Sequence, residues 1–116
     1  MRVFGVGSRV RRASMTEPAV IAPVGELDLH TVRALTPQLD EAVAADYPQV
    51  ILDLSAVTLV DSTALGAIMQ AEHRFRGQGR TLSVVAPNGS AAAVLLELTG
   101  LRGRFSVFPS RDAASA

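Results

Sequence analysis

An aspartate, a serine and a threonine follow one another at Asp61, Ser62 and Thr63. Their side-chain oxygens can accept hydrogen bonds from the free backbone N–H groups of a first helical turn, so helix capping is one sufficient interpretation. The other interpretation is chemical. Two hydroxyls and a carboxylate stand at the positive end of a predicted helix, after an apolar strand, where α/β proteins place their binding sites.

A second carboxylate, Asp28, follows another strand-like segment and precedes a helical one. If the two strands are neighbours, Asp28 and Asp61 approach each other beside Ser62. A serine nucleophile needs a general base, and the only histidines are His30 and His73, which we expect on solvated helix surfaces. The residues therefore predict no hydrolase, and no ligand spacing supports a metal site on the two aspartates.

The composition excludes several other function classes. The chain has no cysteine, which rules out disulfides and thiolate metal sites. Aromatic residues make up only 4% and the arginines are split between the two ends, so we expect no nucleic-acid partner. No apolar run approaches the roughly 20 residues of a membrane span, and none follows the basic N-terminus as in a signal peptide. We expect a cytoplasmic protein without a membrane partner.

The net charge of zero conceals an uneven distribution. Residues 1–16 carry four arginines and no acid, and residues 73–116 carry six arginines and two acids. Residues 17–72 carry nine acids against Arg33 alone, a net charge of −8. Because this acidic stretch contains the candidate site, we expect salt to weaken the binding of a partner there.

The segments that position these residues alternate between strand and helix patterns. The first helix is indicated by Leu35, Leu39 and Val43, which recur every fourth residue. The expected helices run from Thr31 to near Asp46, from Ser62 to about Arg76 and from Ser90 to Thr99. The expected strands are residues 3–10, 19–24, 50–54, 81–86 and 105–108. In the second helix we expect Leu65, Ile68, Met69 and Phe75 inward, and in the third Val94, Leu95 and Leu98.

This order predicts an α/β fold with a mainly parallel central sheet. We expect residues 50–54 and 82–85 as central strands, the first strand paired antiparallel at an edge, and the helices chiefly on one face. A single domain should span residues 1–116, with its core at about 18–108. Residues 1–16 form an edge strand or a leader, with Met15 as an alternative start. Residues 109–116 are expected as a flexible tail too short for a stable helix.

With these elements in place, the sequence resembles the STAS family, which comprises the anti-sigma factor antagonists and their relatives. The resemblance is carried by four pieces in the family's order and spacing. These are residues 25–28 with Thr31, residues 50–54, residues 61–66 and residues 98–101. Together they cover roughly residues 18–108, and four motifs in register are far more specific than any one of them.

The resemblance implies a non-enzymatic switch protein with no cofactor. Its partner would be an anti-sigma factor that is also a serine kinase, and this kinase would phosphorylate Ser62 and thereby end the association. The expected partner-binding and switch residues are Asp28, Asp61, Thr63, Ala64 and Gly66. Ala64 departs from the family's usual glycine and would add a methyl group where the partner's backbone approaches.

Two other classes of function are compatible with the same residues. In one, the domain is a structural subunit that docks on a transporter or a signalling assembly, and Ser62 is only a cap. In the other, the helix N-terminus binds a small ligand or a nucleotide, although the sequence has no glycine-rich cradle there.

Overall fold

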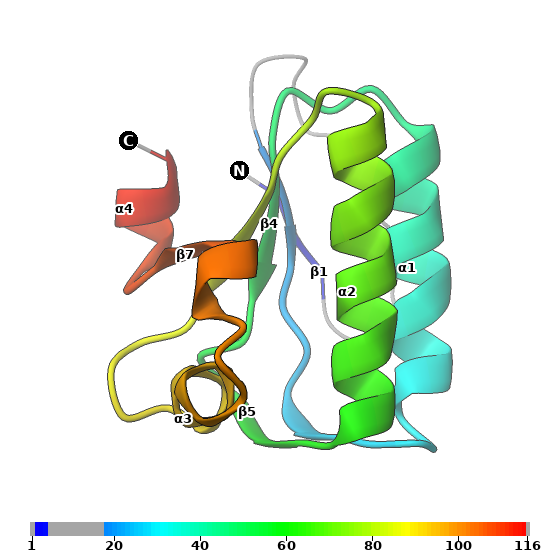
Figure 1. Ribbon diagram of the computed structural model, residues 1–116. Coiled ribbons are helices and arrows are strands. Elements are labelled where there is room, and N and C mark those ends of the chain that lie inside the picture. Colours follow the sequence, from blue (N-terminus) through cyan, green and yellow to red (C-terminus); the bar gives the residue numbers. More distant parts are fainter. Residues whose placement is uncertain (1, 5–17, 116) are drawn as a thin grey trace.

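The computed structural model describes residues 2–4 and 18–115, and the rest of the predicted first strand and the leader lie outside these residues (Figure 1). The main sheet has the strand order β1-β2-β4-β6-β7 within the described chain. Its strands are β1 (Arg2–Phe4), β2 (Ala19–Ile21), β4 (Val50–Asp53), β6 (Leu82–Val85) and β7 (Ser106–Phe108). All four neighbouring pairs are parallel. The predicted antiparallel pairing of the first strand is therefore wrong.

The two strands expected at the centre of the sheet are β4 and β6. Every residue of both strands is buried. Continuous burial is what a strand covered on both faces needs, and it explains why these segments read as unbroken apolar runs. β4 lies in the middle of the five strands, which confirms the predicted core of the fold.

One face of the sheet is covered by α1 (Val32–Ala44) and α2 (Ser62–Gly77), which lie side by side (Figure 1). The side chains predicted to face inward from α1 are all buried. On α2, Ile68 and Phe75 are buried, whereas Leu65 and Met69 are partly buried against the same core. The helical periodicity thus predicted these two core-facing sides correctly.

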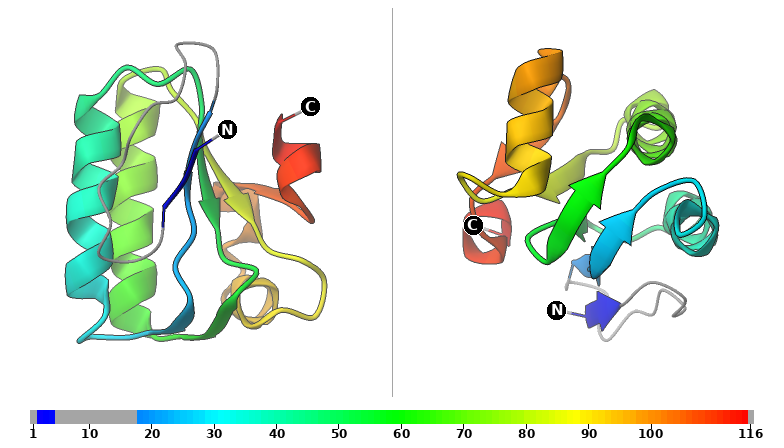
Figure 2. Two further views of the ribbon diagram at one scale, coloured as in Figure 1. Left: turned by 180° about the vertical axis from the view of Figure 1, so that it is seen from behind. Right: turned by 90° about the horizontal axis from the view of Figure 1, so that it is seen from below.

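A second sheet pairs β3 (Gly25–Leu27) with β5 (Val57–Val60) in parallel. The sequence analysis predicts no strand where β5 lies, although the Val-Thr-Leu-Val sequence there has strong β-propensity. Seen from below, the pair lies between α1 and α3 (Ala91–Thr99), as Figure 2 shows. β3 leads into the loop before α1, and β5 leads into the start of α2.

The third helix, α3, faces the other way from our prediction. Val94 and Leu98 are 45% and 80% exposed, Leu95 is half-buried, and the buried residues are Ala92, Ala93 and Leu96. Because all these residues are apolar, periodicity alone could not choose the inner side of this helix. The predicted ends are confirmed, since the Ser90 side chain caps the helix at Ala93 N–H and Gly100 ends it with a φ of 70°.

The other face of the main sheet is covered by α4 (Arg111–Ser115), where we expected a flexible tail. Ala114 is buried against Val20, Ile51 and Val85. The Gln49 side chain donates a hydrogen bond to the Ala114 carbonyl at 2.6 Å. A short helix that is marginal in isolation is therefore held by tertiary contacts.

Candidate functional site

The site begins with the N-cap of α2. Asp61 has an extended backbone, and its Oδ1 accepts a hydrogen bond from the Ala64 N–H at 2.9 Å. The Asp61 carbonyl accepts from the Leu65 N–H at 3.0 Å. Asp61 is therefore the single residue between the end of β5 and the start of α2, and the predicted capping role of this aspartate is confirmed.

The second oxygen of Asp61 ties α2 to a loop that is distant in sequence. Oδ2 accepts from the Leu29 N–H at 3.0 Å, and the Asp61 N–H donates to the Leu27 carbonyl at 3.0 Å. These bonds are possible because Leu27 pairs with Val60, so β3 and β5 end at the same edge. One carboxylate thus joins the β3–α1 loop to the first turn of α2.

Asp28 organises the β3–α1 loop from within. Its Oδ1 accepts from the N–H groups of Thr31 and His30 at 3.0 and 2.9 Å. The Thr31 hydroxyl accepts from Asp28 N–H at 2.9 Å and donates to the Glu26 carbonyl at 2.7 Å. The Thr31 N–H bond is the largest cause of a lowered pKa for Asp28, so this half-buried carboxyl is ionised at neutral pH.

Ser62 and Thr63 are both exposed at the start of α2. Within the described residues, neither hydroxyl makes a hydrogen bond, whereas the carboxylates of Asp61 and Asp28 both accept bonds from backbone N–H groups. Two histidines were the candidate bases. His30 contributes only its backbone N–H to the loop, and His73 is exposed three turns further along α2. The described residues therefore give Ser62 an accessible hydroxyl without a base to activate it.

Two further motif residues, Ala64 and Gly66, differ in orientation. Ala64 is fully buried, so its methyl group packs in the core and cannot meet a partner, which corrects our expectation for this position. Gly66 lies one helical turn after Ser62 and shares its face. A Cβ added at Gly66 would meet no atom within 4 Å, so the surface above it is open.

Large hydrophobic side chains are exposed at the end of the molecule that contains the β3–α1 loop and the start of α2. The sequence analysis did not predict this group. Among the described residues, the exposed large hydrophobic side chains are Val24, Leu29, Leu59, Val94 and Leu98. All of them lie on the β3–β5 pair, its adjoining loops or α3, which share one end of the molecule in Figure 2. An apolar patch in one place is typical of a protein interface.

The charges at this end are not neutralised. Neither Asp28 nor Asp61 forms an ion pair in the described part of the chain, whereas Asp40, Asp53 and Glu72 each pair with an arginine. The described residues also contain no group of three side chains suited to hold a metal ion. The site therefore combines an accessible hydroxyl, two free negative charges and an apolar rim.

The comparisons with known proteins identify the family. A model described as the STAS domain matches residues 10–114. The chain belongs to the STAS domain family. The fold and the family that the sequence motifs implied are thereby confirmed.

A curated relative from Mycobacterium tuberculosis is named anti-sigma-F factor antagonist RsfB. It is 37% identical over 90 residues, which are 78% of this chain and 72% of the relative. The crystal structure of an anti-sigma factor antagonist from Mycobacterium paratuberculosis has a TM-score of 0.79 at 30% identity, over 90% of this chain and 86% of that one. A putative anti-sigma factor antagonist from Thermotoga maritima has a TM-score of 0.73 at 26% identity, over 84% and 83%.

These relatives are named as anti-sigma factor antagonists, which are regulatory proteins, in agreement with the prediction of a non-enzymatic protein. No helix in the described residues is long and apolar enough to cross a bilayer. The assignment of the phosphorylation and partner-binding residues stays a prediction.

Proposed function

We propose that this protein is an anti-sigma factor antagonist, which binds a kinase-type anti-sigma factor and is released when that kinase phosphorylates Ser62. The observation that carries the proposal is the exposed, unbonded Ser62 hydroxyl directly after the capping aspartate. The names of the relatives with 37% and 30% identity support the same role. The partner is therefore a protein, and the small STAS domain frees a sigma factor by occupying its inhibitor.

In this mechanism the partner supplies the catalysis. The Ser62 oxygen attacks the γ-phosphorus of ATP bound to the kinase, ADP leaves, and a base of the kinase takes the hydroxyl proton. The STAS domain contributes only the acceptor, which is consistent with the lack of a base beside Ser62. Its rigid presentation at a helix start serves this role, because the reacting oxygen needs positioning more than activation by its own chain.

Phosphorylation would add about −1.5 to −2 charges beside Asp28 and Asp61. The helix N-terminus offsets part of this charge through its free N–H groups, so the fold survives. A partner docked on the same spot would have to bury a hydrated dianion among carboxylates. A loss of about 3 kcal/mol is enough to weaken binding more than a hundredfold.

Ser62 is the proposed acceptor and Thr63 is not. Both side chains are exposed, so accessibility does not distinguish them. Successive helical residues point about 100° apart, and a docked kinase can therefore face only one of the two. Ser62 occupies the position directly after the motif aspartate, and it shares a face with the open surface over Gly66.

The proposal is tested with purified anti-sigma factors from the source organism and ATP, with intact mass and peptide mapping as the readout. We expect one phosphate on Ser62 of the wild type and none on Ser62→Ala. Ser62→Ala should bind the anti-sigma factor without being released, and Ser62→Asp should bind at least about a hundredfold more weakly.

Thr63→Ala is the matched control, because it removes the neighbouring hydroxyl from the same helical turn. It should keep both phosphorylation and release. The three variants should unfold within about 0.5 kcal/mol of the wild type, since neither hydroxyl has a partner to lose. Phosphate on Thr63, or wild-type binding by Ser62→Asp, would contradict the proposal.

A further inference from the structure

The exposed face of α3 is unusually apolar for a surface helix. Glu97 is the only charged residue among its nine. Val94 and Leu98 are four residues apart and therefore share one face, with 45% and 80% of their surface exposed. A helix that is apolar on all sides is normally buried, so the free domain leaves a surface that a partner would cover.

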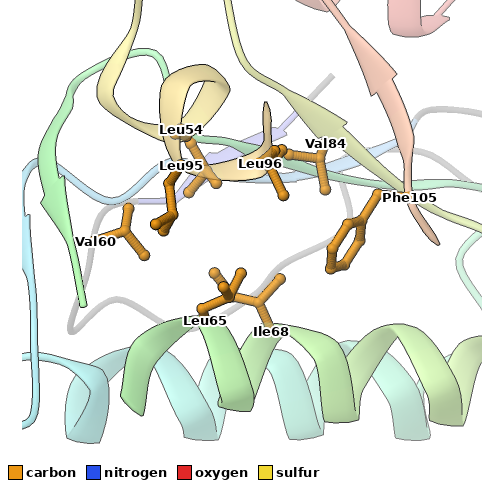
Figure 3. Close-up of a pocket in the computed structure, with 9 residues that line it drawn as sticks. Leu54, Val60, Leu65, Ile68, Val84, Leu95, Leu96 and Phe105 are labelled. Atoms are coloured by element: carbon orange, nitrogen blue, oxygen red, sulfur yellow. The ribbon is translucent and has the colours of Figure 1, made fainter. Parts of the chain in front are cut away.

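The inner side of α3 packs near the start of the helix that carries Ser62. Next to Val94, the half-buried Leu95 points toward Leu65 of α2 and Val60 of β5, as Figure 3 shows. Leu65 lies in the first turn of α2, three residues after Ser62. The start of α2 and helix α3 therefore lie on two sides of one apolar cluster, and a partner that covers Ser62 has α3 close by.

The gap between these side chains is not itself a ligand site. It has a volume of about 10 Å³ and is lined only by apolar residues. Such a space holds at most one water molecule and offers it no hydrogen-bond partner, so it stays dry. The functional surface is the outer side of α3, which Val94 and Leu98 form.

We infer that Val94 and Leu98 form the apolar part of the docking surface for the anti-sigma factor. Phosphorylation leaves this part unchanged, whereas it changes the neighbouring part around Ser62. This inference rests on the proposed function. The occupant is the anti-sigma factor, because the apolar face adjoins the proposed phosphorylation site and because the neighbouring carboxylates are unpaired. The matching surface on the partner combines an apolar patch with basic residues at its edge.

A second copy of this chain fits the same surface less well. Two copies facing each other through α3 would bring two acidic ends together, each with the unpaired Asp28 and Asp61. Like charges across an interface oppose association. A basic partner, in contrast, gains from the same charges.

The α3 side chains and Ser62 should affect binding in different ways. The α3 side chains carry no charge and are separate from the phosphate, so they should strengthen binding in both states of Ser62. Replacing them should therefore lower the affinity of the kinase for this domain and raise the KM for phosphorylation. The kcat should stay unchanged, because the Ser62 hydroxyl is presented as before.

The experiment uses the full chain with the double substitution Val94→Gln and Leu98→Gln, and the anti-sigma factor that phosphorylates the wild type. Binding is measured by titration calorimetry, and phosphorylation by initial rates. We expect the Kd and the KM to rise about tenfold or more with kcat unchanged. The thermal midpoint should change little, because Leu98 is mostly exposed and Val94 about half exposed in the free protein.

Two controls make the result specific. Glu97→Gln changes the same helix without touching its apolar face, and His73→Gln replaces an exposed side chain three turns beyond Ser62 on α2. Both should bind within about twofold of the wild type. A loss with His73→Gln equal to that of the α3 pair would overturn the assignment to α3.

The remaining outcomes separate this inference from the proposed function. If the α3 variant binds like the wild type while Ser62 is still phosphorylated, the inference fails and the proposed function stands. If sedimentation shows a wild-type dimer that the α3 substitutions dissociate, a second copy covers α3 and the inference is overturned. If no anti-sigma factor phosphorylates the wild type, the proposed function fails and this inference fails with it.

Discussion

Asp53 and Asp61 stand at similar places in the fold, because Asp53 is the last residue of the parallel strand β4 and Asp61 directly follows the parallel strand β5. Asp53 is only 4% exposed, pairs with Arg111 of α4 and accepts two bonds from Ser55, from its hydroxyl and its N–H. The Asp61 carboxylate accepts bonds from backbone N–H groups, at Leu29 and Ala64, and forms no ion pair with any of the described residues. The same residue type thus holds the fold together at one strand end and presents a charged surface at the other.

The difference lies in how each charge is balanced. A carboxylate that is buried with an arginine contributes to stability and is hidden from partners. A carboxylate that is satisfied by backbone dipoles keeps its full charge at the surface, where a partner can respond to it. We therefore expect variants at the Asp53 end to change folding alone, and variants at the Asp61 end to change both folding and binding.

The largest effect on folding should come from Asp53→Ala. It removes the partner of Arg111 and both Ser55 bonds, so the free energy of unfolding should fall by about 2–3 kcal/mol. Asp61→Ala loses a cap and the bond to Leu29, which costs about 1–2 kcal/mol. Urea unfolding measures both values. Affinity for the anti-sigma factor should fall only with Asp61→Ala. An equal loss of affinity with Asp53→Ala would contradict the different roles assigned to the two aspartates.

A smaller effect should come from Arg111→Ala, and it should depend on pH. Burial raises the pKa of Asp53, but the bonds from Ser55 and Arg111 outweigh it and hold the pKa below the ordinary 3.8. A lowered carboxyl pKa stabilises the fold fully above the unfolded value, and this contribution is lost as the pH falls through the folded pKa. Arg111→Ala should therefore cost about 1–2 kcal/mol at about pH 7.

The difference between wild type and Arg111→Ala should vanish in acid, below the folded pKa of Asp53, where the carboxyl is protonated in both proteins. Asp28 also has a lowered pKa, but it is present in both proteins and cancels in the comparison. Denaturant unfolding at a series of pH values measures the difference. A gap that is independent of pH would show that Arg111 acts through packing and not through its charge.

The smallest effect should come from Gly66→Ala. No atom lies within 4 Å of the added Cβ, so the domain should gain about 0.5–1 kcal/mol from the better helix former. Binding of the anti-sigma factor should nevertheless weaken, because the methyl group lies on the Ser62 face. Gly77→Ala is the matched control at the far end of α2, where the added Cβ also meets nothing. If both variants bind alike, the partner does not approach the helix at Gly66.

Much of the fold could be predicted from local pattern. The central strands follow from short β-branched runs, and α1 and α2 follow from apolar residues at helical spacing. The capping role of Asp61 follows from its residue type ahead of an apolar helix. Each of these features depends on neighbours within a few positions, and so the sequence contains the signal directly.

The remaining features depend on contacts between residues that are far apart in the chain. α3 is apolar on every side, so only its packing against β5 decides that Val94 and Leu98 face outward. Helix α4 is anchored by the contact between Arg111 and Asp53, which are 58 residues apart. The loop at Leu29 is anchored by Asp61, which is 32 residues away. The sequence by itself determined which residues could form the site, and the tertiary structure decided which of them face a partner. The physical reason is that orientation is chosen by the free energy of long-range contacts, which no local spacing records.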